Sequence, residues 1–585
     1  MLPDVGPATR ARVRRAVRVA IVLLVVWLLA TGVLLFLARQ RVSAGLDRLQ
    51  RVRSQLTADA LLRGQGLGAL EAAERDFASA HRLAASLVLR PWSIVPLAGG
   101  NVDAVRALTA AADRVAAVGA RAARDGTAAL KTRPATPEGR LALLDRVAAI
   151  AGRANQDLNQ LSTGPDFFLV GPLGSARTRF LDRLHRLREA VANAEALASA
   201  AARVLRGPRH YLVLAANNGE MRAGSGMLLS AGVATFGGGT FTMGPMGPSA
   251  NHDLPAGAVP VPPALAPLWG WVGPSQHWRN LATSPRFDVT APLAAQMWEA
   301  ATGQRVDGVL AVDADALAAI LAAQGPVSAG GQEVSAGDVV SYLLLGQYAG
   351  VPATPVSEAD RRDQLSGIAQ ASVHALTDRP WNGPTLVSQL ADAGKGRHVL
   401  AWARDPAEQR AWEAAGIAGE LQPDSLSLSI LNFGGNKLDQ FLEADATLGV
   451  RARSDGSSDA RITVRLHNAA PTDLAGYVAG PYPGGGAAEG VYQGVLGLNV
   501  PGGSTVPSLQ GPGAALVAGA DGPTVAAAVG YFQVARDQTV SFTASFRLPP
   551  GLRAVTVEPS ARLPATTWHF RALKVTDARV EHLSW

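Results

Sequence analysis

The sequence predicts a multidomain α+β protein with one N-terminal membrane-spanning helix. Three features support this prediction: an uncharged apolar stretch near the N-terminus, a long alanine-rich region with helical periodicity, and short apolar runs separated by glycine and proline after residue 206. A chain of 585 residues is also too long for a single hydrophobic core. We expect a tail at 1–18, a transmembrane helix at 19–38, a helical bundle or stalk at 39–206, an α/β domain at 207–421 and a β-sandwich-like module at 422–585.

The apolar stretch at residues 19–38 contains no charged residue. As a helix it would cover about 30 Å, the thickness of the hydrocarbon core. A cleavable signal peptide is the alternative, since "VSAG" at residues 42–45 suits a cleavage site, but its apolar region would span only about 7–15 residues. The arginines before residue 19 favour a cytoplasmic N-terminus. We therefore expect a single-pass cell-membrane protein whose bulk lies outside the cytoplasm.

The charge distribution argues against nucleic acid as a partner. The net charge is +7, but the basic excess lies in residues 1–206 and the rest of the chain is mildly acidic. A duplex-binding domain would instead concentrate basic residues on one folded surface. The chain has no cysteine, which excludes disulfides, thiolate metal sites and cysteine nucleophiles.

Four segments between the predicted span and residue 206 have helical periodicity: 42–89, 101–131, 137–161 and 175–205. Proline and glycine separate them, as expected at helix ends. A spacer that lifts the following domains off the membrane is the simpler interpretation, and a bundle that binds protein partners is the alternative. The sequence identifies no such partner.

Polar residues cluster where the first predicted strand of the α/β domain ends. "RHYLVLAANNGEMRAGSGMLLSAG" (residues 209–232) places Asn217, Asn218, Glu220 and Arg222 directly after the apolar run. Ligands of α/β sheets bind where strands end and loops begin. We expect ligand contacts at this turn, with an asparagine-capped structural turn as the alternative. The glycines at 224 and 226 would let backbone approach a ligand.

Three segments carry a resemblance to an uncharacterised bacterial family, catalogued as domain of unknown function number 4012. They are the stretch just quoted, "TGQRVDGVLAVDADALAAILAAQGPV" (residues 302–327) and "NFGGNKLD" (residues 432–439). Their order resembles the family from about residue 91 to residue 445. The resemblance implies an envelope protein but no chemistry.

A more distant resemblance is to the LytR-CpsA-Psr phosphotransferases, on the same strand–turn–arginine order and on "DRRDQ" (residues 360–364). That family is membrane-anchored and moves glycopolymers from a polyprenyl pyrophosphate carrier. The resemblance implies that Arg222, Arg361 and Arg362 bind phosphate and that magnesium is present. The family's early aspartates are here Asn217 and Asn218, which are weaker magnesium ligands, and no cofactor is evident from the residues themselves.

The C-terminal region alternates polar and apolar residues in "DARITVRLHN" and "QTVSFTASFRL", which is typical of half-buried antiparallel strands.

The sequence gives no support for a serine hydrolase with a nucleophile elbow or for a zinc protease, because neither a GxSxG nor an HExxH motif occurs. Trp271, Trp278 and Trp298 suit either a core or a sugar-stacking surface. We therefore expect an extracytoplasmic protein that binds a phosphorylated polyprenyl-linked or cell-wall glycan. If the resemblance to the phosphotransferases holds, the protein also transfers this glycan. A non-catalytic scaffold of envelope or polysaccharide assembly is the alternative, so the sequence does not decide whether this is an enzyme.

Overall fold

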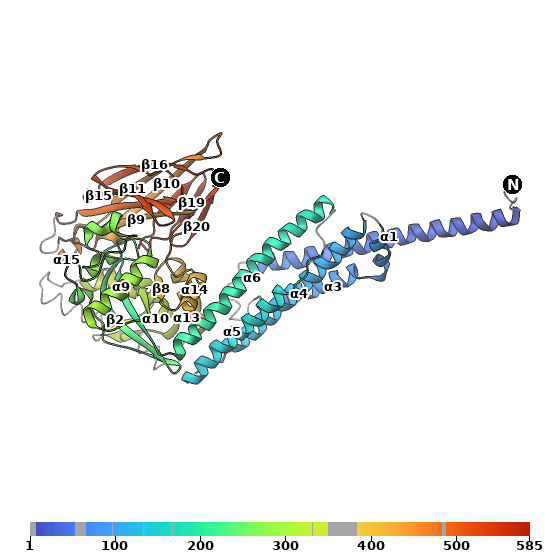
Figure 1. Cartoon of the computed structure of the whole chain (residues 1–585), viewed down its shortest axis with the longest axis horizontal. Coiled ribbons are helices and arrows are strands. Elements are labelled where there is room, and N and C mark those ends of the chain that lie inside the picture. The colour runs from blue at the N-terminus through green and yellow to red at the C-terminus, as the bar shows by residue number, and fades with distance from the viewer. Residues whose placement is uncertain are drawn as a thin grey trace. The chain divides into compact units, whose positions relative to one another are not determined.

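The computed structural model describes residues 7–52, 66–95, 98–132, 134, 136–164, 169–329, 332–348, 383–481 and 487–585 (Figure 1). The chain divides into two compact units. The first comprises Met1–Thr132 and Leu143–Ala198, and the second comprises Arg133–Ala142 and Ser199–Trp585. The predicted α/β and β-sandwich regions therefore lie within one unit.

The first unit is built from long helices. They are α1 (Pro7–Val52), α3 (Leu67–Ala84), the short 3-10 helix η1 (Leu87–Ile94), α4 (Ala98–Leu130), α5 (Pro137–Asn159) and α6 (Gly171–Arg206), the last of which continues into the second unit. The predicted helix at 42–89 is divided in the structure, because α1 extends the membrane-spanning stretch without a break and α3 is a separate helix. The other three predicted helices are present with ends shifted by a few residues.

One helix among the described residues, Arg18–Gln50 within α1, is long and apolar enough to cross a membrane, and the mean hydropathy of its most apolar 18-residue window is 2.9. Its apolar side chains are largely exposed, as in a segment that needs a lipid environment. The segment η1 packs against it. The Trp27 and Trp92 rings stack with centroids 4.8 Å apart, and the Trp92 indole donates to the Thr31 hydroxyl.

The first part of the second unit is a mixed sheet covered by helices. The strands, in the order β3-β2-β1-β5-β8 with β4 on β2, are β1 (Arg209–Asn217), β2 (Met227–Gly237), β3 (Thr240–Met243), β4 (Gly247–Pro248), β5 (Gly308–Val312) and β8 (Val399–Ala403). Only β1 and β5 run parallel, and the other pairs are antiparallel. The helices around this sheet are η2 (Ser249–His252), α7 (Ala266–Trp269), η3 (Gly270–Val272), α8 (Trp278–Leu281), α9 (Phe287–Thr302), α10 (Ala314–Gln324), α11 (Val339–Leu344), η4 (Gly346–Tyr348), α13 (Gly383–Lys395) and α14 (Pro406–Ala414). A separate two-stranded sheet, β6 (Val327–Ala329) and β7 (Gln332–Val334), lies between α10 and α11 in the chain.

The C-terminal part contains two six-stranded sheets around a common apolar core, as the alternating sequence predicts. One sheet has the order β13-β16-β11-β10-β18-β19 and the other β14-β15-β12-β9-β17-β20. The elements are β9 (Ser425–Asn432), η5 (Leu438–Phe441), β10 (Leu442–Ala452), β11 (Ser458–Asn468), α15 (Gly476–Ala479), β12 (Tyr492–Pro501), β13 (Ser508–Gln510), β14 (Ala514–Asp521), β15 (Thr524–Val534), β16 (Thr539–Leu548), β17 (Ala554–Val557), β18 (Thr567–Phe570), β19 (Leu573–Thr576) and β20 (Glu581–Ser584).

Candidate functional site

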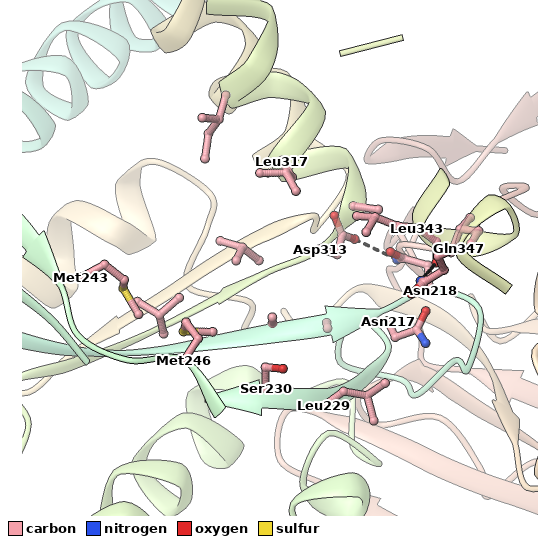
Figure 2. A pocket seen from close by; sticks show the side chains of 17 residues that line it. Asn217, Asn218, Leu229, Ser230, Met243, Met246, Asp313, Leu317, Leu343 and Gln347 are labelled. Carbon is pink, nitrogen blue, oxygen red and sulfur yellow. Dashed lines mark hydrogen bonds between the residues drawn. The ribbon is translucent and has the colours of Figure 1, made fainter. Parts of the chain in front are cut away.

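A cavity of about 150 Å³ lies against one face of the mixed sheet, bounded by β1, β2 and β5 and by helices α10 and α11 (Figure 2). Its wall is apolar except for five residues. The lining consists of Val213, Ala215, Ala216, Asn217, Asn218, Leu229, Ser230, Met243, Met246, Val312, Asp313, Ala314, Leu317, Ile320, Leu343, Leu344 and Gln347.

The alternation of side chains along β1 explains why a cavity forms on this face. Leu212 and Leu214 point into the fully buried core on the other face, whereas Val213 and Ala215 line the cavity. Because Ala215 is small, it leaves space that a larger side chain would fill. The strand ends at Asn217, where the lining becomes polar.

Most of the polar lining residues gather toward one end of the cavity, and Ser230 lies between the two ends. Figure 2 shows Asn217, Asn218 and Gln347 at that end, and Met243 and Met246 at the opposite one. The structure therefore places the two predicted asparagines on the cavity wall. Gln347 completes this end from a segment more than a hundred residues further along the chain, and the sequence alone gave no signal for it.

Asn218 is fully buried and its amide has a fixed orientation. Its Nδ2 donates to Asp313 Oδ2 at 2.8 Å and to the Ala561 carbonyl at 2.9 Å. Its Oδ1 and the Oε1 of buried Gln347 have no hydrogen-bond partner among the described residues. The amide nitrogen of Gln347 donates to the Leu343 carbonyl.

Asp313 caps helix α10, as its position directly after β5 suggests. Its Oδ1 accepts from the backbone N–H groups of Asp315 and Ala316, and its Oδ2 accepts from Asn218 and from His398 Nδ1 at 2.7 Å. Burial disfavours the charged form of His398, but the carboxylates of Asp313 and Asp315 outweigh it and raise the pKa of the imidazole. The one carboxylate on the cavity wall is thus already paired.

The rest of the predicted turn connects the sheet to the C-terminal part. Asn217 Oδ1 accepts from Gly219 N, and its Nδ2 donates to Glu220 Oε1 at 3.2 Å. Glu220 forms a buried ion pair with Lys437. Burial lowers the pKa of Lys437 to about 7, although the nearby Asp439 carboxylate opposes the shift.

Arg222 is buried and its guanidinium binds backbone carbonyls. Nε donates to the Arg279 carbonyl at 3.0 Å, and Nη1 donates to the carbonyls of Met221 at 3.0 Å and Asn432 at 2.5 Å. The guanidinium also lies over the Phe433 ring, 4.7 Å from its centroid. Arg222 is not part of the cavity wall, and these contacts join the turn to β9 and the segment around α8.

A second cluster of buried polar groups surrounds the carboxylate of Asp439, two residues after Lys437 in the chain. The Asp439 carboxylate accepts from Met221 N at 3.0 Å, Asn432 Nδ2 at 2.8 Å, the Tyr492 hydroxyl at 3.0 Å and Arg562 Nη1 at 3.1 Å. Burial raises the pKa of Asp439, and Arg562 is the main group that opposes this shift. We call these four donors and Asp439 the Asp439 network.

The other predicted positions have different outcomes. Arg361 and Arg362 lie outside the described residues, so their predicted phosphate contacts stay a prediction. Gly226 has a φ of 105° and lies against the Asn217 backbone, where a Cβ would come within 2.7 Å of the carbonyl oxygen. Its glycine is therefore required by the turn itself. Trp278 and Trp298 are buried, whereas Trp271 is 43 % exposed.

Among the described residues, no group of three or more His, Asp or Glu side chains is placed to hold a metal ion.

Residues 206–348 match the model of a family described as "Protein of unknown function (DUF4012)". All the residues that line the cavity lie in this range, and so do two of the three segments that carry the resemblance. The segment at 432–439 and the Asp439–Arg562 pair lie outside it. No curated protein and no solved structure matches the chain.

Proposed function

We propose that this chain is a membrane-tethered protein of the cell envelope that binds the apolar chain of a polyprenyl lipid in the cavity beside β1. The observation that carries the proposal is the cavity wall, which is apolar over most of its area and has most of its polar residues toward one end. Sites for small apolar ligands have this composition, with a few polar groups that fix orientation.

The size of the cavity limits what it holds. An engineered cavity of about 150 Å³ binds one benzene molecule, so this one accommodates roughly one isoprene unit. Burying five carbons at about 0.8 kcal/mol each gives about 4 kcal/mol, which corresponds to a Kd of about 1 mM. Such weak binding needs a high local lipid concentration, and the apolar helix Arg18–Gln50 would supply it by holding the protein at a membrane. In this proposal the N-terminus is cytoplasmic and the second unit is extracytoplasmic.

The resemblance to LytR-CpsA-Psr proteins suggests a phosphorylated glycan as the remainder of the ligand, with transfer as a further step and magnesium as its ion. The cavity wall itself includes neither lysine nor arginine, so a phosphate would have to lie outside it. The buried contacts of Arg222 and Glu220 favour the second candidate, a non-catalytic scaffold of envelope assembly. The two candidates differ in whether the cavity is occupied by lipid.

Photoaffinity labelling of the full chain in lipid nanodiscs tests the proposal. The probe is a ten-carbon isoprenoid that carries a diazirine on its terminal unit, and the readout is the fraction of intact protein that gains its mass. We expect saturable labelling of the wild type. Ala215→Phe should abolish it, because the phenyl ring takes the space of the ligand.

The matched control is Ala515→Phe, which adds the same ring to an exposed position of edge strand β14. It should label like the wild type. Unfolding in urea should show that Ala215→Phe is no less stable than Ala515→Phe, since filling a cavity seldom destabilises a protein by much. If Ala215→Phe and Ala515→Phe are labelled equally, the scaffold remains as the function. A second probe, an isoprenyl phosphate that carries a diazirine, tests the role of magnesium. Equal labelling of the wild type by this probe with and without Mg²⁺ would remove the ion from the proposal.

A further inference from the structure

We infer that the 3-10 helix η1, which connects α3 to α4, inserts into the lipid bilayer beside α1 and contacts the acyl chains with its exposed apolar side chains. This inference rests on the membrane anchoring by α1 in the proposed function and is independent of the cavity. It adds a second segment that contacts the membrane, at Leu87–Ile94.

The contacts between η1 and α1 place η1 near the middle of the apolar stretch at residues 19–38. The Trp27 indole donates to the Val88 carbonyl at 2.8 Å, and the Trp92 indole donates to the Thr31 hydroxyl at 3.1 Å. Trp27 precedes the last residue of the stretch by eleven residues, which corresponds to about 17 Å along a helix. Val88 therefore lies at the level of the middle of a hydrocarbon core about 30 Å thick.

The apolar stretch cannot span a bilayer without carrying η1 into it. Residues 19–26 of α1 are exposed, whereas Trp27 is half-buried and Thr31 and Ala38 are buried. The exposed residues alone would cover about 12 Å as a helix, less than half of the core. Moving the span toward the N-terminus would instead place Arg18 and the arginines before it in hydrocarbon. If α1 spans the bilayer, η1 lies at the depth of the core.

The polar groups of η1 are paired as a setting without water requires. A 3-10 helix pairs its backbone groups internally at a spacing of three residues. At its start, Leu89 N donates to the Ser86 carbonyl at 3.0 Å and Val88 N donates to Ser86 Oγ at 3.4 Å. Pro91 has no N–H to leave unpaired. Acyl chains offer no hydrogen-bond partner, so a segment among them must satisfy its own groups.

The exposed side chains of η1 suit contact with lipid. Leu87 is 70 % exposed, more than any other large apolar residue that the structure describes. Arg90 is the charged residue of η1, and it too is exposed. A long arginine side chain extends toward the head groups and draws phosphate and water toward itself, so the inference includes local thinning of the bilayer beside η1.

Fluorescence quenching in single-cysteine variants of the full chain in nanodiscs tests the inference. The wild type has no cysteine, so Leu87→Cys gives one site for a nitrobenzoxadiazole label. The quencher is a lipid with a nitroxide near the middle of its acyl chain. Leu29→Cys, 65 % exposed within the apolar stretch, is the positive control. Lys131→Cys is the negative control, because Lys131 is exposed and follows the 33 residues of α4, about 50 Å along that helix from its start beside η1.

We expect the nitroxide to reduce the fluorescence of the labels at Leu87 and Leu29 by about twofold or more, and to leave the label at Lys131 unchanged, because only the first two lie among acyl chains. A second variant, Val95→Cys, places the label at the C-terminal end of η1, where the side chain is 38 % exposed. It should be quenched as well, which guards against a label that disturbs the structure around Leu87.

The outcomes separate the inference from the anchoring on which it rests. Quenching at Leu29 without quenching at Leu87 and Val95 would overturn the inference and keep the anchor. No quenching at Leu29 would overturn the anchor and the inference with it. A blue-shifted label at Leu87 that the lipid does not quench would show that protein covers η1, which also contradicts the inference. The occupancy of the cavity is measured separately, by the labelling of Ala215→Phe.

Discussion

Two buried polar regions flank the turn after β1, and they differ in how completely their groups are paired. The Asp439 carboxylate accepts hydrogen bonds from four donors and forms an ion pair with Arg562. At the cavity, Asn218 Oδ1 and Gln347 Oε1 have no partner among the described residues. Paired buried polar groups stabilise a fold, and each unpaired one needs an explanation; Arg562 Nε, within the Asp439 network, is also buried without a partner among the described residues. The Asp439 carboxylate is thus part of the structural framework, and the binding role proposed for the second region rests on its apolar cavity wall.

Breaking the Asp439 network should have the largest effect on stability. Arg562→Met leaves the Asp439 carboxylate buried without its ion-pair partner, which typically costs about 3–5 kcal/mol of unfolding free energy. Urea unfolding followed by tryptophan fluorescence measures it. Arg451→Met, at an exposed position of β10, should change stability by less than about 0.5 kcal/mol. Similar values for the two variants would mean that the network does not stabilise the fold.

Arg222 tests whether the turn belongs to the structural or the binding region. Arg222→Met removes the donors of three backbone carbonyls, two of them in buried hydrogen bonds, so we expect a loss of about 1–3 kcal/mol in stability and probe labelling within about twofold of the wild type. The opposite pattern, unchanged stability with loss of labelling by an isoprenyl phosphate, would restore the phosphate role that the sequence predicts for this residue.

The pH dependence of stability sharpens the comparison further. The pKa of Lys437 falls from 10.5 to about 7 on folding, so the unfolded chain binds more protons between these values. The contribution of Lys437 to stability therefore rises with pH from about 7 to 10.5 and is constant below pH 7. Urea unfolding at pH 6.5 and pH 9.5 should show this rise in the wild type.

The control replaces the whole ion pair, so that no lone charge is left buried. In Lys437→Met combined with Glu220→Gln, the stability difference between the two pH values should become smaller. An unchanged difference would show that other groups, such as His398, govern the pH response. His398 would change stability in the opposite direction, because its raised pKa makes its contribution fall as the pH rises.

Much of the fold follows from local patterns in the sequence. Period-two alternation predicts strands such as β11 and β16, and glycine and proline mark the ends of α4, α5 and α6. The mixed sheet was harder to foresee, because the parallel pairing of β1 with β5 joins segments almost a hundred residues apart.

The site was predictable only in part, for the same reason. The sequence singled out Asn217 and Asn218 because polar residues at a strand end stand out in an apolar sequence; both line the cavity, and their contact with a ligand stays a prediction. Gln347 was missed because it reaches the cavity from a distant helical segment, and nothing local distinguishes it from a surface glutamine. The contacts of Arg222 with Asn432 depend on the packing of β9, which lies 210 residues further on.

The central claim is that an apolar chain occupies the cavity beside β1, and a peptide-level map of the diazirine cross-links tests it most directly. The full chain is labelled in nanodiscs, digested and sequenced by mass spectrometry, with Ala215→Phe and Ala515→Phe in parallel. The account predicts adducts on cavity-lining segments, above all those that contain Met243, Met246, Leu317 and Ile320, in the wild type and in Ala515→Phe but not in Ala215→Phe. Adducts confined to helix α1, or spread equally over all three proteins, would contradict it.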